Sequence, residues 1–420
     1  SALVPDQPWF CRSAVTAHPP ATGDRIKDSA SEQKSVQKCT FWRNCAILCR
    51  LWRQNRHVGG LEMDVGIMGL AASGKSTLFG LLTGQDPDAP TARHGSVQIG
   101  IARVPDSRLD ALSSMYSPEK TTPASVRYVD VPGIPEEHRR EAAFNLPELR
   151  AVDALMVVLR AFENDAVAHP KGSMNPIRDL QYIEEEFILQ DQLVVEKRLE
   201  RISRDLRTRK VPELEREAEL LKRCRAVLEN EQPLRAETFA EHEMKVLRGF
   251  TFLSAKPMLI VLNIGEHQLS DEPFSDPEWA DWIERPQMAY TQVCAPLEAE
   301  LAQLDGNDAG AFMSDFGIED RALDRVIRES YRLLGSISFF TVGSDECRAW
   351  SIRSQTPAVE AGGVIHSDIQ RGFIRAEVVP HDALLEAGSL AACRQLGTLR
   401  LEGKTYPVED GEVVHFRFNV

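Results

Sequence analysis

The chain has 420 residues, of which 43% are hydrophobic, and at about 100 to 200 residues per domain this is enough for two to four well-filled domains. Such a composition excludes an intrinsically disordered or fibrous protein. The 63 acidic and 49 basic residues give a net charge of −14, which argues against a general nucleic-acid or membrane coat and leaves room for a local basic patch.

The first 62 residues differ from the rest of the chain. They carry nine Lys/Arg against five Asp/Glu, and they hold four of the eight cysteines. Their apolar positions follow neither the period of a helix nor that of a strand. We expect residues 1–62 to be an atypical N-terminal extension outside the fold, with a basic targeting arm as the alternative.

The sequence offers no run of about 18 apolar residues, so we expect no membrane span. The scattered cysteines imply no disulfide framework, and a reducing compartment is their natural setting. We therefore expect a cytoplasmic monomer that binds no membrane.

A short apolar stretch, residues 64–68, leads into a G-x4-G-K-S sequence and then into a helical pattern. Small residues let successive backbone N–H groups turn toward a phosphate chain, and the helix start adds partial positive charge. Lys75 would reach the outer phosphates, and Ser76 would bind Mg²⁺. A glycine-rich turn that binds nothing is the alternative. The candidate nucleotide-binding residues here are Gly69, Ala72, Ser73, Gly74, Lys75, Ser76 and Thr77.

A second apolar strand, residues 126–131, carries the start of a D-x-x-G sequence about fifty residues after the phosphate loop. Asp130 would hold Mg²⁺ through a water molecule, and the N–H group of Gly133 would sense the terminal phosphate. Lys75, Asp130 and Gly133 are therefore the candidate catalytic residues.

Two continuous apolar runs, residues 154–162 and 257–262, are typical of strands buried on both faces of a mostly parallel sheet. The second run is followed by Asn263, Ile264 and Glu266 in the place where most GTPases have N-K-x-D. Ile264 replaces the lysine and Glu266 replaces the aspartate that pairs with guanine. ATP is therefore as plausible a substrate as GTP on the chemistry alone.

Further motifs extend over most of the chain: residues 104–109 (V-P-D-S-R-L), residues 162–165 (F-E-N-D), and a C-terminal series within residues 340–404. Together with the phosphate loop and Asn263-x-x-Glu266, they resemble the YchF family of Obg-like ATPases over residues 63–420. This resemblance implies a P-loop domain that hydrolyses ATP, and often GTP less well. It also implies a helical insertion, a C-terminal ubiquitin-like TGS domain and association with ribosomes.

The resemblance also supplies further site residues. Phe162 matches an aromatic residue on the base side of the family's site, and a buried core position is the alternative. Cys294 lies in the loop that backs the base, where its backbone rather than its thiol would contact the nucleotide. Thr91 is our candidate for the switch threonine that binds Mg²⁺, although an ungapped match places His94 there. Val157 stands where the family's proposed catalytic histidine aligns.

Residues 179–256 have the composition of charged helices, with leucines at three- and four-residue spacing on both sides of Pro212. We expect a helical hairpin whose tip is basic, and we interpret the tip either as a solvated surface or as a contact with ribosomal RNA phosphates. The basic residues of this tip are Arg198, Arg201, Arg204, Arg207, Arg209 and Lys210.

The C-terminal residues alternate as short strands at 337–342, 372–378 and 413–418, which favours a compact β-grasp unit. Residues 356–368 are expected to form a recognition loop between them, with a structural role for His366. The predicted domains are residues 63–178 and 257–336 as the two parts of the P-loop domain, 179–256 as the helical insertion, and 337–420 as the TGS-like domain.

These expectations define an α/β protein with a mostly parallel sheet, a helical hairpin and a C-terminal β-grasp domain. Its expected function is that of a ribosome-associated switch that hydrolyses ATP, or GTP, with Mg²⁺. The alternative is a nucleotide-binding scaffold with little or no hydrolysis, favoured by the altered phosphate loop and by Val157.

Overall fold

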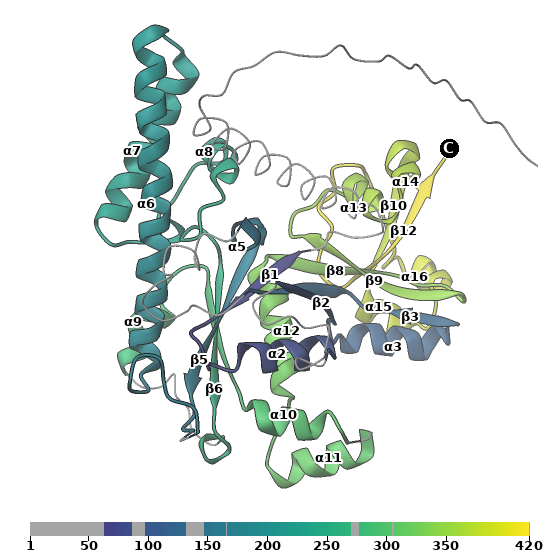
Figure 1. Cartoon of the computed structure of the whole chain (residues 1–420). Coiled ribbons are helices and arrows are strands. Elements are labelled where there is room, and N and C mark those ends of the chain that lie inside the picture. The colour runs from purple at the N-terminus through teal and green to yellow at the C-terminus, as the bar shows by residue number, and fades with distance from the viewer. Residues whose placement is uncertain are drawn as a thin grey trace, which may run out of the picture. The chain divides into compact units, whose positions relative to one another are not determined.

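The computed structural model describes residues 63–85, 97–131, 147–164, 166–269, 277–304 and 306–419, all of which belong to one compact unit, residues 59–420. Within these residues the strands form two sheets of six strands each (Figure 1). Neighbours in the first sheet pair in parallel except for an antiparallel β2–β4 pair. In spatial order its strands are β2 (Gln98–Arg103), β4 (Ser125–Asp130), β1 (Asp64–Met68), β5 (Ala154–Ala161), β6 (Met258–Ile264) and β7 (Met288–Val293).

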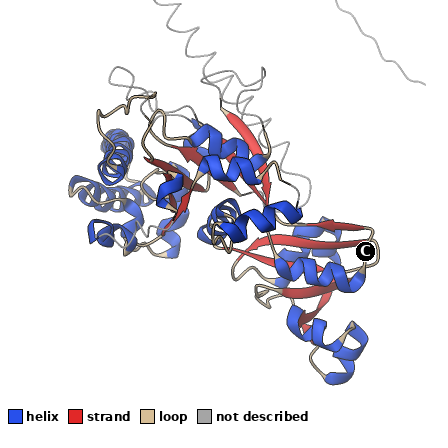
Figure 2. Ribbon diagram, turned by 90° about the horizontal axis from the view of Figure 1, so that it is seen from below, coloured by secondary structure: helices blue, strands red, loops and turns tan. Residues whose placement is uncertain are grey.

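Helices cover both faces of the first sheet (Figure 2). Along β5, Met156 and Val158 face a core shared with α2 (Lys75–Thr83) and α12 (Ala322–Leu333), whereas Leu155 and Val157 face a core shared with α6 (Pro176–Thr208). All four side chains are fully buried. Burying one such side chain contributes about 1.5–3 kcal/mol, which explains why residues 154–159 of this strand are all apolar. The mostly parallel α/β architecture expected from the sequence is confirmed.

The second sheet is mixed, and its β12–β8 and β9–β3 pairs are parallel. One face packs against α13 (Ala358–Ile365) and α14 (Ser367–Gly372), and the other packs against α15 (His381–Ala387) and α16 (Leu390–Leu396). In spatial order its strands are β11 (Arg400–Glu402), β10 (Phe373–Pro380), β12 (Glu412–Phe418), β8 (Ser336–Thr341), β9 (Glu346–Arg353) and β3 (Lys120–Thr122).

Two elements from the N-terminal half of the described chain, one strand and one helix, associate with this second sheet. β3 forms its edge, and α3 (Ser107–Tyr116) packs Leu109 and Leu112 against Cys347 and Ala349 of β9. The residues between β2 and β4 therefore leave the first sheet and return to it. The three-residue strand β3 has the sequence Lys-Thr-Thr and no apolar pattern of its own. Its strand conformation therefore depends on pairing with β9.

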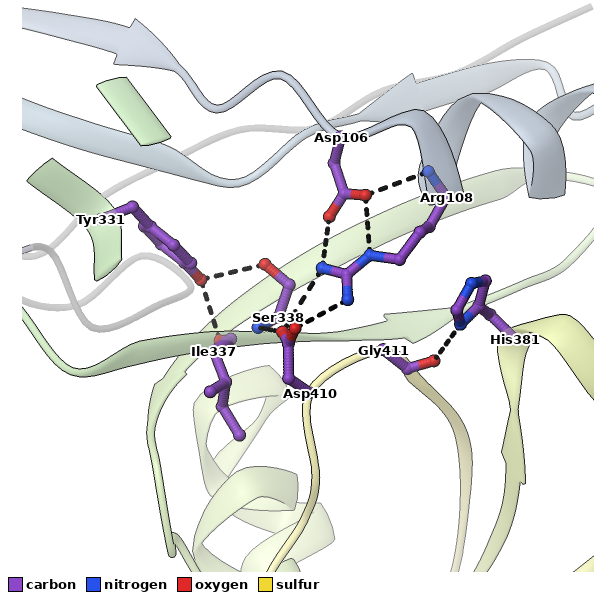
Figure 3. Close-up of polar contacts among 8 residues, drawn as sticks. All are labelled: Asp106, Arg108, Tyr331, Ile337, Ser338, His381, Asp410 and Gly411. Carbon is purple, nitrogen blue, oxygen red and sulfur yellow. Dashed lines mark hydrogen bonds and ion pairs between the residues drawn. The ribbon is translucent and has the colours of Figure 1, made fainter. Parts of the chain in front are cut away.

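A polar junction joins α3 to the second sheet (Figure 3). The guanidinium of Arg108 donates two hydrogen bonds to Asp106, each 2.9 Å long, and another of 2.7 Å to Asp410. Asp410 also accepts a 2.8 Å bond from the backbone N–H of Ser338. Nearby, the hydroxyl of Tyr331 donates to the carbonyl of Ile337 at 2.8 Å. The V-P-D-S-R-L motif is thus an attachment point between the two sheets.

The expected helical hairpin is present. Helix α6 begins at Pro176 after the N-cap Asn175, and α7 (Pro212–Glu229) begins at Pro212 and runs beside it (Figure 1). Val195, Ile202 and Leu221 lie in the apolar seam between the two helices. Arg198 does not contribute a free charge to the tip, because it pairs with Glu217 of α7 at 2.6 Å.

Residues 356–368 contain α13 and the start of α14 rather than the recognition loop expected from their glycines. Ala358 and Ala361 are fully buried against Phe339 and Trp350, so the small residues of α13 allow the helix to approach the sheet closely. His366 acts as the N-cap of α14, since its Nδ1 accepts a 3.2 Å bond from the N–H of Asp368.

The remaining helices connect these parts, and no helix of the described chain is long and apolar enough to cross a membrane. They are α5 (Pro147–Ala151), η1 (Leu234–Ala236), α8 (Glu241–Leu247), η2 (Arg248–Phe250), η3 (Glu266–Gln268), η5 (Pro277–Trp279), α9 (Ala280–Ile283), α10 (Ala295–Leu301) and α11 (Gly306–Asp315).

Candidate functional site

The loop between β1 and α2 has a conformation that its small residues permit. Ala72 and Gly74 both adopt left-handed backbone angles, with φ of 61° and 87°. A Cβ added at Gly69 would lie 2.5 Å from the carbonyl oxygen of Val158, and one at Gly74 would lie 2.2 Å from the side chain of Asn263. Both glycines are therefore required, and the loop ends at the N-terminus of α2, where backbone N–H groups are unpaired and attract anions.

Three of the predicted site residues meet at the carboxyl edge of the first sheet. The ammonium group of Lys75 lies 3.3 Å from Asp130 Oδ1, and the hydroxyl of Ser76 donates to Asp130 Oδ2 at 3.1 Å. Asp130 ends β4 and is 4% exposed, while Lys75 and Ser76 begin α2. Burial raises the pKa of Asp130 above its ordinary value, and Lys75 and Ser76 offset only part of that effect.

Asn263 ties the phosphate loop to the neighbouring strands. Its Nδ2 donates to the carbonyl oxygen of Ser73 at 3.1 Å, and its Oδ1 accepts from the N–H of Ala295 at 3.4 Å. Ser73 itself is 2% exposed, and its hydroxyl has no hydrogen-bond partner within the described residues. A buried hydroxyl without a partner is costly, so this loop conformation carries a cost at Ser73.

A cavity of about 500 Å³ opens next to Asn263 and Gly74. Thr77, Phe162, Ile264 and Glu266 contribute to its wall, so six of the twelve residues predicted for the nucleotide line one cavity. A volume of this size falls in the range typical of small-molecule sites. A larger groove of about 1410 Å³ runs between α7 and α8, but none of the predicted site residues lines it.

Cys294 occupies the position expected from the sequence, between β7 and α10. Its side chain is 3% exposed and packs in the apolar core, where burial raises the pKa of the thiol. The next residue, Ala295, both binds Asn263 and lines the cavity. Cys294 itself does not line this cavity, whereas its neighbour Ala295 does.

Two predicted residues, Thr91 and Gly133, lie outside the described residues, as does His94. Val157 is fully buried within β5. Sequence reasoning missed Arg160, which supports the cavity wall near Phe162 through contacts with backbone carbonyls. The only signal for Arg160 was one charged residue near the end of an otherwise apolar strand.

Comparisons with known proteins agree with this arrangement. A family model described as "YchF-GTPase_C: Protein of unknown function (DUF933)" matches residues 336–419. "Ribosome-binding ATPase YchF" of Bacillus subtilis is 37% identical over 367 residues, which cover 86% of this chain and 100% of that protein. The chain belongs to the YchF family of Obg-like ATPases.

Relatives in this family extend from bacteria to plants. "Obg-like ATPase 1" of Oryza sativa subsp. japonica is 34% identical over 368 residues, covering 86% of this chain and 93% of the relative. The structure of the Schizosaccharomyces pombe YchF GTPase superposes with a TM-score of 0.74 at 27% identity, covering 86% of this chain and 100% of that one. The resemblance inferred from the motifs is thereby confirmed.

Proposed function

We propose that this chain is a ribosome-binding ATPase that uses ATP hydrolysis to change its conformation. The names of its relatives support the activity, since they are called ribosome-binding ATPase and Obg-like ATPase. The single observation that carries the proposal is the convergence of Lys75, Ser76 and Asp130 beside the phosphate loop. This arrangement matches the positioning and electrostatic stabilisation that phosphoryl transfer requires.

The donor set at this edge fits Mg²⁺. The hydroxyl of Ser76 would bind Mg²⁺ directly and the carboxylate of Asp130, 3.1 Å from that hydroxyl, would hold it through a water molecule, and both are hard oxygen donors. Among the described residues no group of three or more His, Cys, Asp or Glu side chains could hold a metal, so phosphate and water would complete the shell. Mg²⁺ would neutralise phosphate charge there, and we propose Thr91 as a further ligand and Gly133 as the sensor of the terminal phosphate.

The nucleotide base would occupy the cavity bounded by Phe162, Ile264 and Glu266. Phe162 offers an aromatic surface for stacking, and Glu266 offers a carboxylate that accepts hydrogen bonds from an amino group. ATP is the proposed substrate because the relatives are named ATPases, and GTP remains the competitor that the experiment must include.

A nucleotide-binding scaffold without turnover is the second candidate. It is favoured by Val157, which is fully buried and offers no group for hydrolysis, and by Ala72 in the phosphate loop. Binding alone does not distinguish this candidate from an ATPase, so turnover must be measured.

The proposed ribosomal contact is the tip of the α6–α7 hairpin. Its arginine and lysine side chains are exposed, and phosphate contacts by such residues give affinity without sequence recognition. The exposed basic residues of the tip are Arg201, Arg204, Arg207, Arg209 and Lys210.

The proposal is tested by titrating the intact chain with ATP and with GTP, in the presence and absence of Mg²⁺. We expect tighter binding of ATP and a clear gain in affinity with Mg²⁺. Sedimentation with ribosomes in the ATP-bound state tests the partner. The absence of any nucleotide binding would contradict the proposed site.

A further inference from the structure

Arg160 is the one charged residue of β5, and it lies at the carboxyl end of that strand. It is 5% exposed and pairs in register with Asn263 of β6, the residue that holds the phosphate loop. A buried guanidinium is unfavourable unless its N–H groups find acceptors. The buried guanidinium of Arg160 must therefore have hydrogen-bond acceptors close by.

The guanidinium of Arg160 binds three backbone carbonyls of the segment that follows β5. Its Nε donates to the oxygen of Phe162 at 3.1 Å, its Nη2 to the oxygen of Asn164 at 3.1 Å, and its Nη1 to the oxygen of Val167 at 3.0 Å. Phe162 and Asn164 line the cavity beside the phosphate loop. The planar guanidinium reaches the three carbonyls with three separate nitrogens in fixed directions, whereas a lysine carries all its donors on one nitrogen.

The same guanidinium also holds the aromatic ring of the wall. Its central carbon lies 4.9 Å from the centroid of the Phe162 ring, within the range of a cation–π contact. Both the backbone and the ring of Phe162 are thus fixed by one buried side chain.

We propose that Arg160 is a positioning residue for the nucleotide base: it fixes the wall formed by Phe162 and Asn164, and through that wall it sets the affinity for the base. This inference rests on the proposed nucleotide site. The phosphate loop is held separately, by Asn263 and by the conformations of Gly69 and Gly74. Loss of Arg160 should therefore weaken binding of the base and spare binding of the phosphates.

The test compares two probes, Mg-ATP and Mg-tripolyphosphate, on wild type and on Arg160→Met. Methionine keeps the length and the apolar stem of the side chain and removes every hydrogen-bond donor. We expect the Kd for Mg-ATP to rise about tenfold, the affinity normally contributed by one well-placed aromatic stack. The Kd for Mg-tripolyphosphate should change by less than about twofold, and the loss should appear in KM rather than in kcat.

Arg325→Met is the matched control. Arg325 also donates to neutral oxygens, those of Thr291 and of the Gln292 and Asp320 backbones, but it does not line this cavity. It should leave both Kd values within about twofold of wild type. Arg160→Lys keeps the charge and loses the fork, so it should show an intermediate loss of ATP affinity and serves if Arg160→Met does not fold.

Equal losses for Mg-ATP and Mg-tripolyphosphate, or no loss for either, would overturn the role of Arg160 while leaving the nucleotide site in place. Wild type that binds neither probe would instead contradict the proposed function itself. A selective loss of ATP affinity in both Arg160 variants, absent in Arg325→Met, would establish the positioning role.

Discussion

Two regions of the molecule pair a basic side chain with aspartate: the carboxyl edge of the first sheet and the junction of α3 with the second sheet. They differ in how fully their polar groups are hydrogen-bonded within the chain. At the junction Arg108 makes three hydrogen bonds of 2.7–2.9 Å to Asp106 and Asp410 and a fourth of 3.3 Å to Asp410. At the carboxyl edge Lys75 lies 3.3 Å from Asp130, and the hydroxyl of Ser73 has no partner within the described residues. The junction satisfies the guanidinium with carboxylates of the chain itself, whereas the edge keeps one buried hydroxyl without a partner.

The pKa shifts point the same way. Burial raises the pKa of Asp130, so its surroundings disfavour the charged form. The hydrogen bond to Asp106, followed by that to Asp410, raises the pKa of Arg108 against the effect of burial, so its surroundings favour the charged form. A bound cation would stabilise the charged form of the Asp130 carboxylate, which the unliganded fold disfavours. Functional sites with such groups often lower the stability of the unliganded protein.

The largest expected effect is that of Lys75→Ala. Removing the ammonium group takes away the cation that would contact the outer phosphates, so we expect Mg-ATP affinity to fall by about a hundredfold or more. Isothermal titration measures this loss. The unliganded protein should also lose some stability at neutral pH, because Lys75 offsets part of the burial cost of the Asp130 carboxylate, so the titration is made at a temperature where the variant is folded. Unchanged affinity and turnover would remove Lys75 from the site.

Arg108→Gln tests the opposite region. We expect it to lower the free energy of unfolding by about 1–2 kcal/mol, less than for a fully buried ion pair, because Asp410 is about half exposed. Urea denaturation measures this change, and Mg-ATP affinity should stay within about twofold of wild type. Arg332→Gln, which removes an exposed arginine from α12, is the control and should change stability by less than about 0.5 kcal/mol. A stable Arg108→Gln protein would show that the junction is dispensable.

Glu266→Asp should change the choice of nucleotide without changing the fold. A carboxylate shorter by one methylene restores the aspartate of the GTPase motif, so we expect the ratio of GTP to ATP affinity to rise about fivefold. Competition titration gives the ratio directly. Glu300→Asp on the exposed side of α10 is the control, and an unaltered ratio in Glu266→Asp would exclude this carboxylate from base selection.

Asp130→Asn should separate stability from ligand binding. A raised pKa means that the folded wild type loses stability as pH rises through the interval between the ordinary aspartate value and the raised one. At neutral pH the neutral amide should therefore raise the unliganded Tm by about 1–2 °C while abolishing the gain from Mg²⁺. This advantage should vanish below the ordinary aspartate pKa, where the wild-type carboxyl is also neutral. A lower Tm at neutral pH would contradict the assignment of Asp130 as a strained site residue.

Local sequence patterns were sufficient to predict the carboxyl edge. The spacing of Gly69, Gly74 and Lys75 encodes a turn and a helix start, and long apolar runs such as residues 154–159 identify strands buried on both faces. The glycines of residues 356–368 were ambiguous, because Gly362 and Gly363 suggest a loop in the sequence but allow close packing when a helix lies on a sheet.

Long-range and backbone contacts could not be predicted in this way. Arg108 and Asp410 are 302 positions apart, so no local pattern joins them. The partners of Arg160 are carbonyl oxygens, which every residue possesses and which therefore leave no sequence signature. β3 is a strand only through its pairing with the edge of β9, more than 200 residues away in the sequence.

The most direct test is single-turnover hydrolysis of Mg-ATP by the intact chain, with and without ribosomes, at enzyme concentrations above the measured Kd. We expect bound ATP to be converted to ADP and phosphate, faster when ribosomes are present, and Lys75→Ala to be inactive in both conditions. ATP that is bound but not hydrolysed in either condition would contradict an ATPase and favour the nucleotide-binding scaffold.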